Sequence, residues 1–285
     1  MRAVRRLVSP GRFGQGALKV VLYLILVAFA VSFIYPFLWM AAASLKPERE
    51  IGTLALWSPH FSLRGYFYVF HQIPIARAFF NSAFVSLTAT FSTLVLSSMV
   101  GYALGRLRFL GRDFIFNLVL FTMLIPGQLT LIPMYVLIVK LHWTDTYWAL
   151  IAPAMISNMG ILIFRQFFLT IPGELTDAAR IDGCSEWRLL FQIVWPLSKP
   201  ALITVGIVSF IGIWNDVLWP LIVIRNWQMM TMPQMVTLFH VGGLAGAQVS
   251  AEMAAIMLLA LPVVLAYAFL QRYFIESLAL SGLKG

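Results

Sequence analysis

The residues of this chain most able to do chemistry lie between positions 165 and 199, a segment with four basic and four acidic side chains. If the segment is helical, Leu175, Ala178, Ala179 and Asp182 share one face by i, i+3, i+4 spacing. Small side chains at 178 and 179 let a helix approach a concave partner closely, and the flanking charges fix its register. A short amphipathic loop at the membrane surface, with no partner, explains the same pattern, and both interpretations stay open on the residues alone.

Local signals divide this segment into two helices. Pro172 favours a helix start, and Glu174 and Asp177 near that start suit the helix dipole. Gly183 permits the left-handed residue that ends a helix. Ser185 is suited to cap a second helix, which Pro196 is expected to end. We therefore predict a helix–turn–helix within residues 172–200.

Motifs for catalysis, metal binding and nucleotide binding are missing from the sequence. The four histidines are dispersed without metal-ligand spacing, at positions 60, 71, 142 and 240. The sequence contains no HExxH or GxSxG, no paired acids in an apolar stretch and no GxxxxGK[ST] loop. We expect no catalytic residue, no metal site and no cofactor in this chain, so the energy for any work must come from another subunit or a gradient.

The amino-acid composition indicates whether the helices that carry this segment lie in water or in a lipid bilayer. Hydrophobic residues make up 61% of the 285 residues, charged residues 11%, and the mean hydropathy is +0.88. Because soluble domains carry about 25% charged residues, this chain fits a hydrocarbon environment. Six stretches lack any Asp, Glu, Lys or Arg: residues 20–45, 78–105, 114–139, 146–164, 200–215 and 253–271.

The fold class we predict is all-α, a polytopic bundle of six transmembrane helices. Spanning the bilayer takes about 20 apolar residues, and five of the stretches meet that length. The fifth in order, 200–215, does so only if it continues through Asp216 to Ile222. Pro126-Gly127 and Pro133 should bend or break the third helix. Gly101-x3-Gly105 near the end of the second permits close helix contact.

The distribution of basic residues predicts the orientation. Alternate compartments would receive residues 1–19, 104–113, 165–199 and 271–285, which hold 14 of the 20 Lys and Arg. The positive-inside rule places these segments, and both termini, in the cytoplasm. Residues 1–19 are then a basic cytoplasmic tail and residues 20–285 one transmembrane domain. The net charge of +9 is scattered over short loops, so it reports topology and not nucleic-acid binding.

The one acidic residue inside an apolar stretch is Asp216, which follows Asn215 near the outer end of the fifth helix. Ionisable groups at membrane depth usually face a bundle interior or a cavity, so Asn215 and Asp216 are candidates for a pathway or gate. The simpler interpretation, which we favour on the sequence, is an interfacial carboxylate beside tryptophans, paired with a cation such as Arg225.

The charged segment resembles the EAA motif of the permeases of binding-protein-dependent ABC importers. The matching run is Asp177-Ala-Ala-x3-Gly183-x9-Ile193-x-Trp195-Pro196. It departs from the family where Asp177 replaces the usual glutamate and Trp195 the usual leucine. Residues that agree with carbohydrate permeases occur along most of the chain, and the match is best to the shorter, six-helix subunit of maltose-type systems: Ser44-Leu45-Lys46, Asn81-Ser82, Gly101-Tyr102-Ala103, Ile132-Pro133, Trp214-Asn215 and Lys284-Gly285.

The resemblance implies a type I importer fold and a coupling loop that docks into a cleft on a cytoplasmic ATPase. The residues it assigns to this coupling are Glu174, Asp177, Ala178, Ala179, Arg180, Asp182 and Gly183.

The partners it implies are a second permease subunit, two copies of the ATPase, which bind ATP and Mg, and an extracytoplasmic solute-binding protein, with lipid around the helices. The cargo would be a sugar, and glycerol phosphate is an alternative. The location would be a bacterial or archaeal plasma membrane. A secondary transporter is the competing class, but it would need more ionisable groups at mid-membrane than Asp216.

Overall fold

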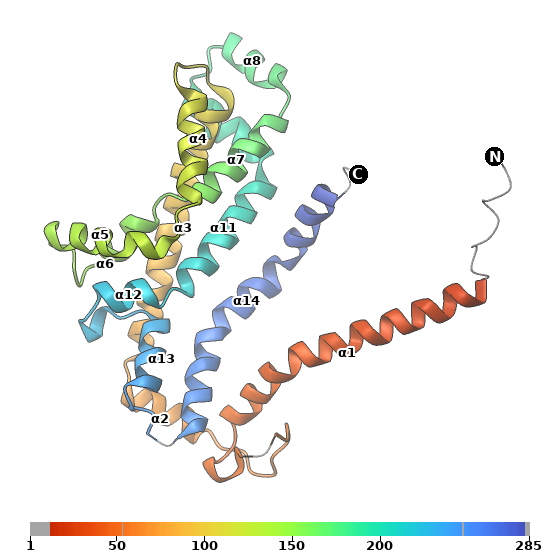
Figure 1. Ribbon diagram of the computed structural model, residues 1–285, viewed down its shortest axis with the longest axis vertical. Coiled ribbons are helices and arrows are strands. Elements are labelled where there is room, and N and C mark those ends of the chain that lie inside the picture. The colour runs from red at the N-terminus through yellow and green to blue at the C-terminus, as the bar shows by residue number, and fades with distance from the viewer. Residues whose placement is uncertain (1–11, 53, 247, 283–285) are drawn as a thin grey trace. The chain divides into compact units, whose positions relative to one another are not determined.

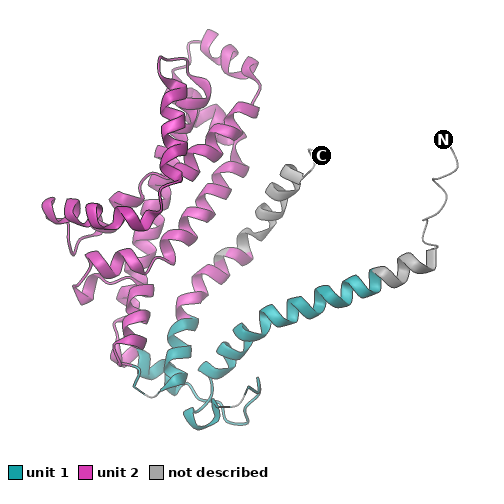
Figure 2. Cartoon of the chain, viewed as in Figure 1, with its two compact units in different colours: residues 1–69, 245–257 teal, residues 70–244, 258–285 magenta. Residues whose placement is uncertain are grey.

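The computed structural model describes residues 12–282 except positions 53 and 247, and every regular element in that part is helical. Most of the basic tail and the closing residues 283–285 lie outside the described residues. Contacts divide the chain into two compact units, residues 1–69 with 245–257 and residues 70–244 with 258–285 (Figure 2).

The first unit contains α1 (Arg12–Ser44), the short helix η1 (Glu48–Glu50), most of α2 (Arg64–Gln72) and the first turns of α14 (Val249–Gly282). The Glu48 carboxylate accepts hydrogen bonds from the Val249 amide at 2.7 Å and from the Ser250 amide at 3.0 Å. Negative charge at a helix N-terminus is stabilising, so Glu48 fixes where α14 begins. Gly65 of α2 lies so close to Ser250 that a Cβ there would be 2.7 Å from its carbonyl oxygen.

The core of the second unit is formed by three helices that pack along one another, α3 (Ile75–Arg106), α7 (Asn158–Thr170) and α11 (Lys199–Trp214) (Figure 1). Small residues let the α3 and α7 backbones approach closely, as helix pairs in membranes require. A Cβ added at Gly101 would lie 2.8 Å from Cβ of Phe164, so the close contact predicted at this glycine is confirmed. The buried apolar cluster at this packing includes Tyr102, Phe164, Phe168, Leu189, Val194 and Val205.

Three of the expected spans are broken. The fourth, in the charge-free stretch 146–164, is interrupted by the non-helical residues 155–157 that follow η2 (Ala152–Ala154). The third is divided into α4 (Arg112–Met123) and α5 (Gly127–Lys140), which meet at 101° beside Pro126 (Figure 1). The predicted break at Pro126-Gly127 is therefore confirmed. The fifth was predicted to run to Ile222, but α11 ends at Trp214 and α12 (Leu218–Val223) begins after a non-helical turn.

Shorter helices complete the second unit. They are α6 (Tyr147–Ile151), η2 (Ala152–Ala154), α8 (Gly173–Ile181), α9 (Glu186–Leu189), η3 (Leu190–Val194), α10 (Trp195–Leu197), η4 (Trp227–Met229) and α13 (Met232–Val241).

By length and composition, the described residues contain three helical stretches able to cross a membrane, and up to five if each bent pair counts as one span. The three stretches are Lys19–Ser44, Ile75–Arg106 and Tyr147–Thr170, the last of which contains the break between η2 and α7. The sixth expected segment coincides with the shorter apolar helix Val249–Leu265. The chain is a polytopic all-α membrane protein, as predicted.

The contact at Gly101 yields a stability prediction. Gly101→Ala should lower the free energy of unfolding by about 1–3 kcal/mol, because the added methyl group overpacks the contact between α3 and α7. Gly206→Ala is the matched control, since its Cβ would be 3.7 Å from Leu94, an ordinary contact. Thermal unfolding of the purified variants measures the difference, and equal midpoints for the two would contradict this account of the packing.

Candidate functional site, the charged loop between α7 and α11

The first helix of the loop is α8, and its sequence determines both ends. Pro172 directly precedes it, and the Thr176 hydroxyl donates to the Gly173 carbonyl at 2.8 Å in its first turn. At the other end, Gly183 has φ +77°, a conformation that favours glycine. The Cys184 amide donates back to the Ala179 carbonyl at 2.9 Å. The predicted stop at Gly183 is confirmed.

The second helical segment begins where it was predicted and ends later. The Ser185 hydroxyl accepts from the Arg188 amide at 3.4 Å and caps α9. The helix then continues through the π-helical turn η3 and α10 to Leu197, so the prediction that it ends at Pro196 was one residue short. A bend of 88° separates this segment from α11. Trp195 Nε1 donates to the Ser98 hydroxyl at 3.0 Å, which fastens α10 to α3.

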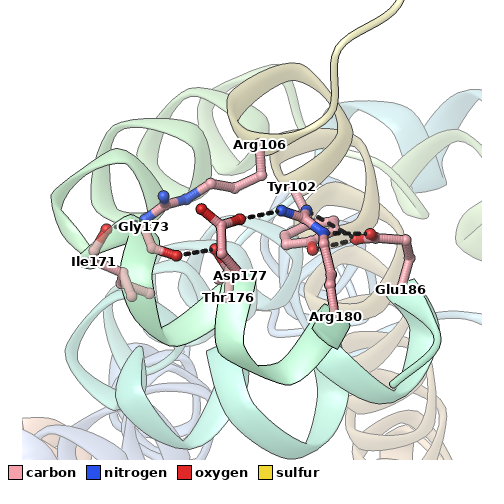
Figure 3. Close-up of polar contacts among 8 residues, drawn as sticks. All are labelled: Tyr102, Arg106, Ile171, Gly173, Thr176, Asp177, Arg180 and Glu186. Atoms are coloured by element: carbon pink, nitrogen blue, oxygen red, sulfur yellow. Dashed lines mark hydrogen bonds and ion pairs between the residues drawn. The ribbon is translucent and has the colours of Figure 1, made fainter. Parts of the chain in front are cut away.

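Arg180 is the centre of a polar network, which we call the Arg180 cluster: Tyr102, Asp177, Arg180 and Glu186 (Figure 3). Arg180 donates to both Glu186 oxygens, at 2.8 and 3.3 Å, and to Asp177 at 2.9 Å. The Tyr102 hydroxyl donates to Glu186 at 2.5 Å. A two-point contact of guanidinium and carboxylate fixes orientation as well as distance. The hydrogen bonds to Glu186 raise the pKa of Arg180 above its ordinary value, so the cation persists at every physiological pH.

A second arginine fixes the start of the loop. Arg106, at the end of α3, donates to the backbone carbonyls of Phe168 and Ile171. These carbonyls lie at and just beyond the C-terminal end of α7, where a cation is favoured. Arg106 and Tyr102 therefore connect α3 to both sides of α8.

Tyr102 and Arg106 were not among the predicted site residues. The sequence signals present were the Gly101-Tyr102-Ala103 match and the basic turn after the second span, and neither indicates a contact with residues 62 to 84 positions away.

The structure separates the two small residues that the sequence placed together. Ala179 is buried at 8% exposure in the apolar cluster with Phe168 and Leu189, so its small side chain serves packing within the chain. Ala178 is exposed. The outward face of α8 also carries Leu175 and Ile181, which is 86% exposed. Glu174, Asp177, Asp182 and Gly183 are exposed, and Arg180 is half-buried.

A cleft of about 690 Å³ lies beside α8. Four guanidinium groups and two carboxylates line it, from Arg106, Arg108, Arg112, Arg180, Asp177 and Glu186. The excess of positive charge suits an anionic group of a partner. Within the described part of the chain, no three of the His, Cys, Asp and Glu side chains come together in a way that could hold a metal ion.

Asn215 and Asp216 lie at the other end of α11 from this loop, in the turn between α11 and α12. Asn215 is exposed and Asp216 is half-buried. The Asp216 carboxylate accepts from the Trp219 amide at 3.3 Å and, among the described residues, forms no ion pair. The ion pair with Arg225 that the simpler interpretation expected is not among those of the described residues, where the Arg225 backbone amide donates to Asp145 at 2.6 Å.

The family model for binding-protein-dependent transport system inner membrane components matches residues 94–279, which include the loop, the Arg180 cluster and the α11–α12 turn. The chain belongs to this family. Its members are transport permeases, and the family and the apolar helices together make this chain a multi-pass membrane protein.

Known proteins similar to this permease share nearly its whole length. The arabinooligosaccharide transport permease AraQ of Halalkalibacterium halodurans is 36% identical over 92% of this chain and 96% of its own. The polygalacturonan/rhamnogalacturonan transport permease YtcP of Bacillus subtilis is 31% identical over 93% and 97%. A crystal structure of a bacterial ABC transporter that imports the acidic polysaccharide alginate has a chain with TM-score 0.81 and 22% identity, covering 94% of this permease and 100% of that chain.

The Arg180 cluster predicts how firmly α8 is held. Glu186→Gln removes the charge that Arg180 contacts at two points, so the amides of α8 should exchange with deuterium about fivefold to tenfold faster, since a half-exposed ion pair of this kind contributes about 1 kcal/mol. Glu174→Gln changes an exposed carboxylate on the same helix and should leave the exchange rate unchanged. Exchange in α8 that is equal in the two variants would show that the cluster does not restrain the helix.

Proposed function

We propose that this chain is the permease subunit of an ATP-driven, binding-protein-dependent importer, and that its cargo is a sugar. The family establishes a transport permease, and relatives that match almost the whole chain are named for the transport of arabinooligosaccharides and of polygalacturonan/rhamnogalacturonan. The observation that carries the proposal is the geometry of α8, a short helix with an exposed outward face that is held to the bundle by a charged network.

The exposed face of α8 is suited to contact an ATPase. Leu175, Ala178 and Ile181 project away from the apolar cluster that buries Ala179. Apolar side chains supply contact energy at the centre of an interface and charged ones the register at its rim. Glu174, Asp177 and Asp182 supply the charged rim of this interface. Gly183 allows the chain to turn away directly after α8.

Coupling requires that a displacement of α8 moves the membrane helices with it. Arg180 and Glu186 tie the loop to Tyr102, and Arg106 ties the end of α7 to the same helix, α3. Ala179 adds apolar contact with the bundle. When the ATPase subunits close on ATP, the loop and α3 move as one body, a rigid-body transmission of a nucleotide-driven change.

The assembly in this proposal contains a second permease subunit, two ATPase subunits that bind ATP and Mg, and a solute-binding protein outside the membrane. The loop faces the cytoplasm, since the segments rich in Lys and Arg lie on its side of the predicted topology. This division of labour leaves the present chain without a catalytic step of its own.

The contact with the ATPase can be tested at Ile181. Ile181→Asp should reduce co-purified ATPase and sugar uptake at least tenfold, because a carboxylate would replace apolar contact area at the centre of the interface. Leu110→Asp is the matched control, since Leu110 is also a fully exposed aliphatic residue, in the turn between α3 and α4. Both variants should reach the membrane at normal levels, and unchanged association in Ile181→Asp would refute the docking face.

The division of labour can be tested on the purified chain. Alone in detergent or vesicles it should hydrolyse no ATP, and addition of the ATPase subunits encoded beside it should restore hydrolysis that responds to the loaded binding protein. Release of phosphate by the isolated chain, above that of a preparation from cells without its gene, would contradict the proposal.

A further inference from the structure

The turn between α3 and α4 lies at the surface of the membrane. One stretch able to cross the membrane ends at Arg106, and the bent pair of α4 and α5, which counts as a further span, begins at Arg112. A connection as short as residues 107–111 stays within the headgroup region of a bilayer. Basic residues beside a membrane helix are suited to bind anionic headgroups, and this turn has Arg108 between the two other arginines.

The cleft beside α8 opens at this turn, and it holds positive charge that the described residues do not neutralise. Arg108 is exposed and takes part in none of the ion pairs among those residues. Arg106 donates to two neutral backbone carbonyls. The two carboxylates of the cleft, Asp177 and Glu186, are already bound to Arg180 (Figure 3). A ligand that balances the remaining charge is therefore an anion.

The cleft borders a side of α8 other than the one proposed to meet the ATPase. Four α8 residues that line the cleft share one face by i, i+3, i+4, i+7 spacing: Gly173, Thr176, Asp177 and Arg180. The proposed ATPase face is centred on Ala178, which lies on the other side of the helix at 3.6 residues per turn. An ATPase docked on that face does not need the cleft.

An exposed apolar stripe on α4 begins beside the same arginines. Phe114 and Phe121 are 68% and 61% exposed, Leu118 lies between them, and i, i+4, i+7 spacing places all three on one face. Arg108 and Arg112 line the cleft and also a hollow of about 440 Å³ that reaches Phe114. An apolar face of this kind on a membrane helix suits contact with acyl chains.

A phospholipid with an anionic headgroup matches both features. Guanidinium groups bind phosphate through paired hydrogen bonds, and the cleft of about 690 Å³ is within the usual range for small-molecule sites, about 300–1,000 Å³. A carboxylate of a partner protein, or inorganic phosphate, would satisfy the arginines but leave the apolar stripe uncovered. A choline headgroup would bring a cation toward the arginines, which repel it.

We propose that the cleft beside α8 binds the phosphate of one anionic phospholipid, with Arg108 and Arg112 as donors at its mouth and the acyl chains along the α4 stripe. This site goes beyond the proposed function, because it concerns neither the cargo nor the nucleotide. Only the choice of the cytoplasmic leaflet rests on the proposed orientation. Since Asp177 and Arg180 form one wall of the cleft, the bound lipid contacts the helix that the ATPase is proposed to move.

Lipid titration of the purified full chain, read by native mass spectrometry, tests the site. Palmitoyl-oleoyl-phosphatidylglycerol is the anionic probe, and phosphatidylcholine with the same chains is the zwitterionic one. The first phosphatidylglycerol should bind about tenfold more tightly than the first phosphatidylcholine, the effect of two arginines on one headgroup. Equal affinities would overturn the proposal, because they would show contact with acyl chains only.

Paired charge variants locate the bound lipid. Arg108→Gln combined with Arg112→Gln should weaken phosphatidylglycerol binding about tenfold and leave phosphatidylcholine binding unchanged. The matched control, Arg188→Gln combined with Lys199→Gln, removes the same charge from two exposed residues outside the cleft lining. Arg108→Gln alone, which breaks no ion pair of the described residues, should weaken binding about fivefold and serves if the double variant fails to fold. Equal phosphatidylglycerol affinity in variant and control would refute the site.

Two further measurements distinguish the other occupants. Sodium phosphate in large excess should not displace phosphatidylglycerol, since it lacks acyl chains, and displacement would assign the cleft to free phosphate. The Arg108→Gln, Arg112→Gln variant should co-purify with the ATPase at the normal level. Loss of the ATPase with lipid affinity unchanged would assign the cleft to that subunit. Either result overturns the lipid site, whereas failure of the unaltered chain to associate with any ATPase would refute the proposed function and leave the lipid site intact.

Discussion

The contact of Arg180 with Glu186 is the interaction on which the position of the charged loop between α7 and α11 depends. A guanidinium that is half-withdrawn from water is favourable only when its donors are matched by acceptors. Here two carboxylates supply them, and Tyr102 supplies a further bond to Glu186. Since Tyr102 belongs to a membrane-spanning helix, the network joins a loop in water to a helix in hydrocarbon. Without that junction, the loop would be connected to α3 through the apolar cluster around Ala179, the backbone contacts of Arg106 and the bond of Trp195 to Ser98.

The hydrocarbon solvent explains why the breaks in the helices are few and where they lie. Every backbone group at membrane depth must be satisfied inside the protein. Side chains do this at the interruptions: the Thr93 hydroxyl donates to the Ala154 carbonyl at 2.8 Å, and Asp216 accepts from the start of α12. A chain that only had to cross the membrane would avoid this cost by staying helical. The break between α11 and α12 is retained although Thr231 nearby is left without a hydrogen-bond partner among the described residues.

Local signals in the sequence predicted the elements well. The charge-free stretches indicated the membrane helices, Pro126-Gly127 the bend between α4 and α5, and Gly183 and Ser185 the turn between α8 and α9. Each of these depends on residues next to one another in the chain. The interruption after Trp214 was missed, because an apolar stretch on both sides of Asp216 has the composition of one continuous span.

Contacts across the fold were not predictable in the same way. The spacing of Ala178 and Ala179 defines a helix face but not which side of it meets the bundle, and the structure buries one and exposes the other. Tyr102 meets Glu186 across 84 positions of sequence, and Val85 and Asp216 line one cavity although 131 positions separate them. Pairings of this kind follow from packing, which a single sequence does not display.

Two helices connect the loop with the cavity, and this gives the distant sites a physical relation. α3 carries Tyr102 near one end and Val85 seventeen residues earlier, a separation of about 25 Å along a straight helix. α11 begins directly after the bonded turn at Ser198 and ends at Trp214, beside Asp216. Close-packed helices move as stiff bodies because their interior contacts resist compression. A displacement applied at α8 is therefore carried toward the cavity by both helices, and since Val85 of α3 and Gly212 of α11 both line its wall, any difference in their movement changes the shape of the cavity.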